Sequence, residues 1–366
     1  MAKPFPATTN MSLKYTGRYH PVMRRRTFIA GAGTAVAATA GCLGYRGDNE
    51  GDGIVTVATY ESFVDGDDPV GPWLKENFEA DHDAELEFTV PSSGINQYIR
   101  RAQEGADIDA DLFVGLNVDE LIRIDEELDD PLFESPAGNL ERSDSVLDEL
   151  RFDPDGRTVP YDTGYISLVY DERNVEPTTF EDLTAEANRG QLITQNAQES
   201  DPGLAFLLWT INEFGADGYL DYWQRLEDND VRILGSWSDA YNAYTNEAAD
   251  MVVSYSTDQV YNGDTPRHQV GFLNDQGYAQ PEGMARFVDA PDSEAATDLM
   301  NYILEPEVQG VIAEKNVQFP AVDDAELDEE FASLAHVPPE PITFDYDELA
   351  GNLDGWVDEW ARQIVE

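Results

Sequence analysis

Short apolar runs alternate with longer amphipathic stretches through most of the chain. Runs such as 54–59, 85–90 and 110–116 have the length of buried strands, and the segments between them have the 3.6-residue spacing of helices. A second set of the same kind follows, with strands expected at 191–194, 251–254 and 283–288. This alternation predicts an α/β protein in which mostly parallel sheets are covered by helices.

The apolar run at 159–171 is too long for one ordinary strand and has Gly164 near its start, which suits a crossing between two lobes. A second return segment is expected at 319–321. A chain of 366 residues also exceeds one ordinary core and indicates two domains. The predicted lobes are 54–160 plus 277–322 for lobe 1, and 161–276 plus 323–366 for lobe 2.

The stretch at 235–258 carries the strongest site signal. Ser238 is the expected N-cap of a helix over 239–247, and the apolar strand after it ends in Ser-Tyr-Ser-Thr. In open α/β sheets ligands sit outside the carboxyl ends of strands, so Trp237 and Tyr255 are expected to flank one cleft. The alternative is that Trp237 is a core anchor and the hydroxyl cluster is a plain turn.

Other polar residues follow strands or precede helices. Tyr60 follows the first strand, and Ser93 can cap a helix that runs to Glu104, where an ordinary N-cap is the simpler interpretation. Together these residues suit a small solute bound between two lobes, without catalysis. The set is Tyr60, Ser93, Gly94, Ser200, Trp237, Tyr255, Ser256 and Thr257.

The sequence contains none of the familiar hydrolase, zinc-protease or phosphate-loop motifs, and its four histidines are scattered. Cys42 is the only cysteine, which excludes a disulfide, a thiolate nucleophile or a cysteine metal site in the domain that follows it. We therefore expect no enzyme activity, no cofactor and no metal. The alternative of an exported, lipid-anchored hydrolase needs a nucleophile–base pair that the sequence does not offer.

The net charge of −52, from 74 acidic and 22 basic residues, excludes a nucleic-acid binder that depends on phosphate contacts. An aromatic content of 11% and periodic apolar segments argue against disorder. A solvated acidic shell suits very salty water, because salt screens the self-repulsion. The composition resembles that of extreme halophiles.

The first part of the chain has the features of an export signal. A basic segment at 24–26 precedes a short apolar run at 30–40, which ends in Ala-Gly-Cys. The arginines resemble the twin-arginine export motif, and the ending resembles a lipobox in which Cys42 is lipidated. We expect 1–45 to hold the signal and lipobox, removed up to Cys42, and 46–53 to be a tether. A membrane-spanning anchor is the alternative, but the run is short for a span.

Six motifs, in order, resemble the thiamine-binding proteins of bacterial ABC importers, from about residue 54 to 320. They are Thr-Tyr-Glu-Ser-Phe at 59–63, Gly-Leu-Asn at 115–117, Tyr-Asp-Thr-Gly-Tyr at 161–165, Pro-Gly-Leu at 202–204, Gly-Ser-Trp-Ser-Asp-Ala-Tyr at 235–241 and Val-Ser-Tyr-Ser-Thr at 253–257. The resemblance implies a two-lobed type II periplasmic-binding-protein fold that closes around thiamine or its phosphates. It also implies delivery of the ligand to the membrane permease of an ABC importer. From the lipobox at Cys42 we expect the protein, as a monomer, to be anchored on the outer face of the cell membrane.

The resemblance also assigns roles to residues. It implies that Tyr60, Trp237 and Tyr255 surround the vitamin with aromatic rings, which attract cations by on the order of 0.5–2 kcal/mol each. The other implied contacts are Glu61 beside Tyr60, Ser93 and Gly94 at one helix start, Ser200 and Asp201 at another, and Ser256, Thr257 and Asp258 after Tyr255.

Two implied contacts differ in charge from the family pattern. Asp201 and Asp258 replace small hydroxyl residues and add negative charge, which favours the cationic thiazolium over a phosphate ester. A related solute-binding protein for ferric iron, a polyamine or a phosphonate is the nearest alternative. Iron is disfavoured, because iron capture in this superfamily usually uses adjacent tyrosines and only Tyr255 stands in its motif.

Overall fold

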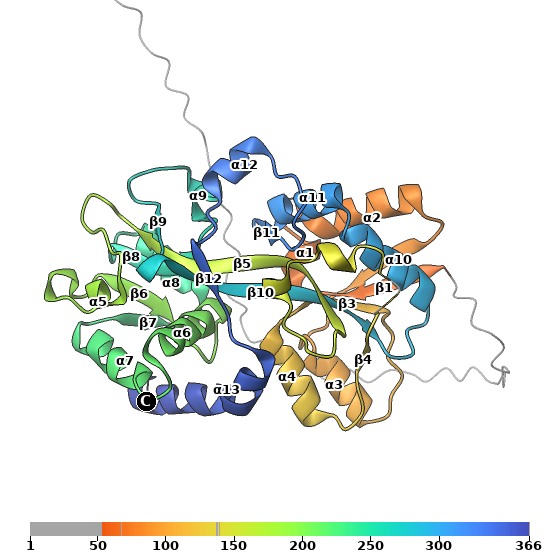
Figure 1. The fold of residues 1–366 in the computed structure, drawn as a ribbon, viewed down its shortest axis with the longest axis horizontal. Coiled ribbons are helices and arrows are strands. Elements are labelled where there is room, and N and C mark those ends of the chain that lie inside the picture. The colour runs from red at the N-terminus through yellow and green to blue at the C-terminus, as the bar shows by residue number, and fades with distance from the viewer. Residues whose placement is uncertain (1–52, 67, 137, 139, 366) are drawn as a thin grey trace, which may run out of the picture. The chain divides into compact units, whose positions relative to one another are not determined.

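The computed structural model describes residues 53–66, 68–136, 138 and 140–365. These residues form a 12-stranded mixed sheet whose main path runs β2-β1-β3-β10-β5-β8-β6-β7 (Figure 1). The strands are β1 Ile54–Ala58, β2 Glu85–Thr89, β3 Leu112–Leu116, β4 Phe133–Glu134, β5 Thr158–Tyr170, β6 Leu192–Gln195, β7 Arg232–Leu234, β8 Met251–Tyr255, β9 Gln269–Gly271, β10 Gln276–Phe287, β11 Phe319–Pro320 and β12 Glu340–Ile342.

Helices follow most of the strands, as the alternation predicts. They are α1 Glu61–Val64, α2 Val70–Asp81, α3 Asn96–Gln103, α4 Val118–Glu127, α5 Phe180–Leu183, α6 Asp201–Phe214, α7 Tyr219–Asp228, α8 Trp237–Thr245, α9 Asp258–Asn262, α10 Ser293–Ile303, α11 Pro306–Asn316, α12 Glu329–Leu334 and α13 Tyr346–Trp360. Pro202 in the first turn of α6 and Gly215 just after its end give this helix sharp limits.

The two ends of the sheet have separate cores. Around β1, β2 and β3, α2 and α10 lie on one side of the sheet and α3 and α4 on the other (Figure 1). Around β6 and β8, a larger core contains the fully buried rings of Trp209, Trp223 and Trp360. Within each end, β1 pairs parallel with β2 and β3, and β6 pairs parallel with β7 and β8. The predicted two-lobed α/β architecture with mostly parallel sheets is therefore confirmed.

Two long antiparallel strands, β5 and β10, join the lobes (Figure 1). The strand predicted over 159–171 corresponds to β5. The second crossing is β10, of which the sequence predicted only the half from residue 283, whereas 319–321 contributes just the short strand β11 against β5. The first half of β10 contains Pro281 and Glu282, residues that disfavour strands and are held here by pairing with Thr163 and Asp162 of β5.

The register of β10 shifts on both of its edges near Gly283. On the β5 side Glu282 pairs with Asp162 and Gly283 with Pro160, so Tyr161 is the extra residue of a β-bulge. On the β3 side Gly283 pairs with Leu116 and Met284 with Val114, which leaves an extra glycine in β3. Bulges redirect side chains and often lie beside functional sites.

Two predicted helix caps are wrong. Ser236, not Ser238, caps α8: its Oγ accepts from the Asp239 amide at 3.1 Å and donates to the Asp239 carboxylate at 2.9 Å. Only Ser236 has an acidic residue three positions later, which makes the bond reciprocal. Ser93 does not cap α3, which begins at Asn96; its Oγ accepts from Arg100 Nη2 at 2.6 Å instead.

Within the described residues, no helix is both long and apolar enough to span a bilayer. The export signal, Cys42 and almost all of the tether at 46–53 lie outside the described residues. The exact lobe boundaries remain a prediction.

Candidate functional site

The candidate site centres on two carboxylates where β5 and β10 cross between the lobes. Asp162 and Glu282 are direct register partners on these strands, and Asp162 is fully buried. Glu282 Oε2 accepts a hydrogen bond from the Tyr161 hydroxyl at 2.7 Å, and Asp162 Oδ2 accepts one from Asn316 Nδ2 at 2.8 Å. Asp162 Oδ1 is buried without a hydrogen-bond partner. We call Asp162 and Glu282 the carboxylate pair.

Tyr60 adds an aromatic ring from the end of β1. Its hydroxyl lies 3.3 Å from the Tyr161 hydroxyl and accepts from Asn316 Nδ2 at 3.1 Å. Its ring rests on Gly115, the extra glycine of β3, where a Cβ would come within 2.5 Å of the ring. Gly115 also has a positive φ of 98°. The bulge and the missing side chain therefore let Tyr60 lie against the sheet.

The carboxylate pair has no Lys, Arg or His partner among the described residues, and its hydrogen-bond donors are neutral. Burial, followed by the charge of Glu282, raises the pKa of Asp162 well above its usual range. Burial also raises the pKa of Glu282. Burial and the nearby carboxylates raise the pKa of Tyr60 and Tyr161, so both hydroxyls remain protonated donors.

Tyr255, at the end of β8, lies on the other side of the same region. A Cβ at Gly164 would lie 3.1 Å from its ring and 2.7 Å from Gln318 Oε1, so ring and amide both approach β5 closely. Burial, then the charges of Asp201, Glu282 and Asp162, raises the pKa of Tyr255. Tyr60, which follows β1, and Tyr255, at the end of β8, therefore lie on either side of the carboxylate pair in the order of the sheet.

Trp237 is tied to the end of β8 by a polar contact. Its indole Nε1 donates to Ser254 Oγ at 3.0 Å, and its ring stacks on Tyr241 with centroids 4.9 Å apart. The side chain is half-buried. The start of α8 and the residue before Tyr255 are thereby held together.

The starts of α6 and α4 bring three acidic residues, Asp201, Asp119 and Glu120, near one another. Ser200 is the N-cap of α6 and its Oγ has no hydrogen-bond partner. Burial raises the pKa of Asp119 and Glu120 at the start of α4. The charge of the exposed Asp201, the next residue after Ser200, adds to this for Asp119, whereas for Glu120 the charge of Asp119 contributes more than that of Asp201. The pKa of Glu120 reaches about 8. Gly94, in the turn with Ser93, would bring a Cβ within 3.9 Å of Glu120 Oε1.

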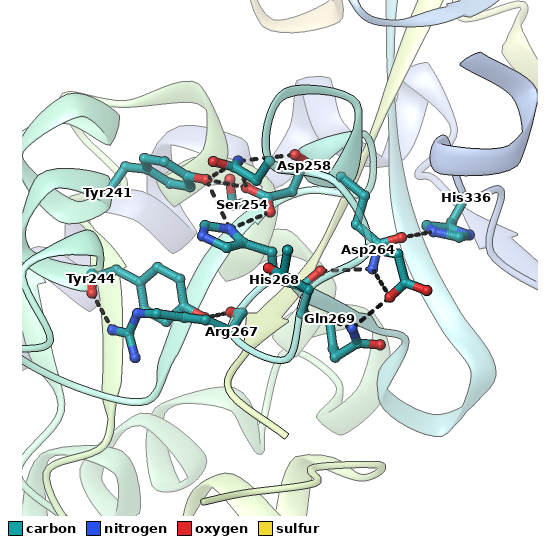
Figure 2. Close-up of polar contacts among 12 residues, drawn as sticks. Tyr241, Tyr244, Ser254, Asp258, Asp264, Arg267, His268, Gln269 and His336 are labelled. Atoms are coloured by element: carbon teal, nitrogen blue, oxygen red, sulfur yellow. Dashed lines mark hydrogen bonds and ion pairs between the residues drawn. The ribbon is translucent and has the colours of Figure 1, made fainter. Parts of the chain in front are cut away.

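Asp258 belongs to a separate network inside the second lobe (Figure 2). Figure 2 shows Tyr241 and His268 pointing toward its carboxylate, which accepts from the Tyr241 hydroxyl and lies 2.8 Å from His268 Nδ1. Ser256 and Thr257 are buried beside it, and the Ser256 Oγ has no partner. Glu61 is exposed at the first position of α1, next to Tyr60.

Sequence reasoning missed Tyr161, Asp162, Glu282, Asn316 and Gln318 as site residues. A signal existed for Asp162, because an aspartate inside a 13-residue strand of almost uniform burial has to be paired or functional. No comparable local signal marks Glu282, whose role depends on which strand lies beside it.

Comparison with known proteins identifies the family of this chain. The profile of the family described as bacterial extracellular solute-binding protein matches residues 73–339. The thiamine-binding periplasmic protein of Salmonella typhimurium is 29% identical over 321 residues, covering 85% of this chain and 93% of that protein. The protein of the same name from Brucella melitensis is 30% identical over 312 residues, covering 84% and 90%.

Solved structures share the fold. A periplasmic thiamin binding protein gives a TM-score of 0.69 at 27% identity, covering 85% of this chain and 96% of its own. The apo ferric ion-binding protein A of Pasteurella haemolytica also gives 0.69, at 14% identity, covering 85% and 98%. The expected type II periplasmic-binding fold is therefore confirmed. The chain belongs to the family of bacterial extracellular solute-binding proteins.

Proposed function

We propose that this protein captures thiamine between its lobes and delivers it to the membrane permease of an ABC importer. Two relatives and one solved structure are named as thiamine-binding proteins, and this chain covers most of the length of each. Their names support thiamine as the ligand. The neighbours that bind ferric ion share only the fold at 14–17% identity and do not argue for iron.

The observation that carries the proposal is the carboxylate pair between Tyr60 and Tyr255. Thiamine has a flat aminopyrimidine and a thiazolium with a fixed positive charge. Tyrosine faces attract such cations, and two carboxylates without a protein cation supply the opposite charge. Exclusion of water strengthens each of these interactions.

In this proposal Trp237 joins Tyr60 and Tyr255 as the aromatic surround. The remaining contacts stay as the resemblance implies: Glu61, Ser93, Gly94, Ser200, Asp201, Ser256, Thr257 and Asp258. Asp201 lies near Asp119, and the charges of these two carboxylates disfavour a phosphate group at the start of α6. We therefore propose a preference for thiamine over its phosphates.

The remaining parts of the proposal concern the whole chain. A monomer is exported by the twin-arginine route, lipidated at Cys42 and held on the outer face of the cell membrane. It binds without catalysis and without a cofactor.

Calorimetric titration at molar salt tests the proposal, with thiamine, its monophosphate, its diphosphate and putrescine as a cationic control. We expect saturable binding of thiamine, weaker binding of both phosphates and no tight binding of putrescine. Tight putrescine binding with no response to thiamine would instead support a polyamine-binding protein, which the carboxylate pair also suits.

A further inference from the structure

The carboxylate pair has a charge imbalance that the protein itself does not correct. The side chain of Asp162 is completely buried, with a relative exposure of 0%, and has no cationic partner among the described residues. Its Oδ2 accepts one hydrogen bond from the neutral amide of Asn316, and its Oδ1 accepts none. Glu282, its register partner, accepts a hydrogen bond from the neutral Tyr161 hydroxyl. A buried carboxylate is costly unless it is paired or protonated.

The groups that face the pair come from five elements and from the loop that holds Gln318, and they bring no positive charge. Tyr60 comes from the end of β1, Tyr161 from β5, Tyr255 from β8 and Asn316 from α11, and Gln318 lies beside Tyr255. Asp201, at the start of α6, adds a further negative charge to the surroundings of Glu282. Two like charges in such surroundings do not both ionise freely, so the pair titrates as a unit with one proton strongly held.

We propose that the carboxylate pair is the subsite for the ligand's fixed positive charge, and that it holds a proton which binding of that charge releases to solvent. The inference rests on the proposed function and adds proton release to it. One positive charge enters and one proton passes from a carboxyl oxygen to the buffer, so the net charge of the site is unchanged and no other bond forms or breaks.

Two consequences follow from this exchange. Affinity for a ligand with a fixed positive charge rises with pH, by at most about tenfold per pH unit for one proton. A neutral fragment of the ligand shows no such dependence, because it does not replace the proton. The charge of a ligand, and not its size, is thus expected to decide whether its affinity depends on pH.

The test is titration of the full chain with thiamine at pH 7 and molar salt, in buffers of different ionisation enthalpy. The slope of the observed enthalpy against the buffer enthalpy counts the protons released. We expect up to one proton per thiamine, and none for the neutral aminopyrimidine alcohol that makes up half of thiamine. A zero slope for thiamine overturns the inference.

Variants locate the proton. Asp162→Asn and Glu282→Gln should each remove the proton release, whereas the surface variant Glu104→Gln, at the exposed end of α3, should keep it. Proton release that persists in both pair variants overturns the assignment to this pair.

A spectroscopic arm separates this inference from the proposed function. At pH 7 the infrared band of a protonated carboxyl should be present in the wild-type protein and weaker in each pair variant. If thiamine does not bind while this band behaves as stated, the proposed function fails. Titration with a simple thiazolium salt then decides whether the carboxylate pair binds a fixed positive charge with release of a proton. If the band is the same in all three proteins, the proton does not reside on the pair and the inference fails.

Discussion

Trp237 stacks on Tyr241 with the two ring planes only 17° apart, while its indole nitrogen donates to Ser254. The indole is thus fixed both by a ring on one face and by a hydrogen bond at its edge. Ser254 precedes Tyr255 in β8, so the orientation of Trp237 is set relative to the ring that lies beside the carboxylate pair.

Trp237→Ala should weaken thiamine binding by about 2–4 kcal/mol, the range for a central aromatic anchor. Trp237→Phe should weaken it less, since a ring face remains although the bond to Ser254 is lost. The control is Trp209→Phe in the core beside Phe180, which should lower the melting temperature with little change in affinity. If Trp237→Ala lowers only the melting temperature, Trp237 is an ordinary core residue.

Gly115→Ala should weaken thiamine binding through Tyr60. The added Cβ meets the Tyr60 ring at 2.5 Å and forces the ring or β3 to move. The matched control is Gly105→Ala, whose φ of +65° imposes similar backbone strain but whose Cβ would have no neighbour within 4 Å. Both variants should lose about 1 kcal/mol or more of stability. Equal affinity in the two variants would argue against Tyr60 as a ligand contact.

Glu120 should make the protein less stable as pH rises. Its pKa of about 8 lies above the value of about 4.3 for an unfolded glutamate, so the folded state binds the proton more tightly. Its contribution is fully present below about pH 4 and is lost as pH rises through 8. Melting temperatures from pH 5 to 9 at molar salt should fall less steeply in Glu120→Gln than in wild type or in the exposed control Glu126→Gln. Parallel curves for all three proteins would contradict this assignment.

The contribution of Asp171 to the pH dependence of stability should have the opposite sign to that of Glu120. Hydrogen bonds from Arg173, with a further contribution from Arg267, lower its pKa to about 2. The stability it contributes is present above about pH 4, the unfolded value, and is lost as pH falls through 2. Asp171→Asn should therefore flatten the loss of stability between pH 4 and pH 2. An unchanged acid transition in that variant would place the main acid-sensitive group elsewhere.

The fold should depend on molar salt. Repulsion among acids that give a net charge of −52 is screened over roughly 10 Å at 0.1 M salt but about 3 Å at 1 M. We expect the thermal midpoint to rise along a series from dilute to molar salt. A midpoint that does not change would count against a salt-dependent acidic shell.

Particular residues show which parts of the fold can be predicted from the sequence and which cannot. The run that became β5 was predictable because its apolar length is a local property. The first half of β10 was not, because Pro281 and Glu282 become strand residues only through their pairing with β5, which is distant in the sequence. Ser236 and Ser238 are equivalent acceptors, and the choice between them depends on the carboxylate of Asp239.

The site shows the same division. The position of Tyr60 and Tyr255 at strand ends made both rings visible as candidates. The partnership of Asp162 with Glu282 was not visible, because it depends on the register of two strands far apart in the sequence.

The continuity of β5 and β10 has a mechanical consequence. Both strands pass unbroken from one lobe to the other, so any change in the angle between the lobes has to be distributed over a hydrogen-bonded ribbon. Such a ribbon bends elastically and returns to its resting curvature when the load is removed. Its least regular point is the register shift at Gly283, beside the carboxylate pair, so a change in the angle between the lobes would be absorbed most easily there. The ligand would then leave from the same part of the molecule at which β5 and β10 return to their resting curvature.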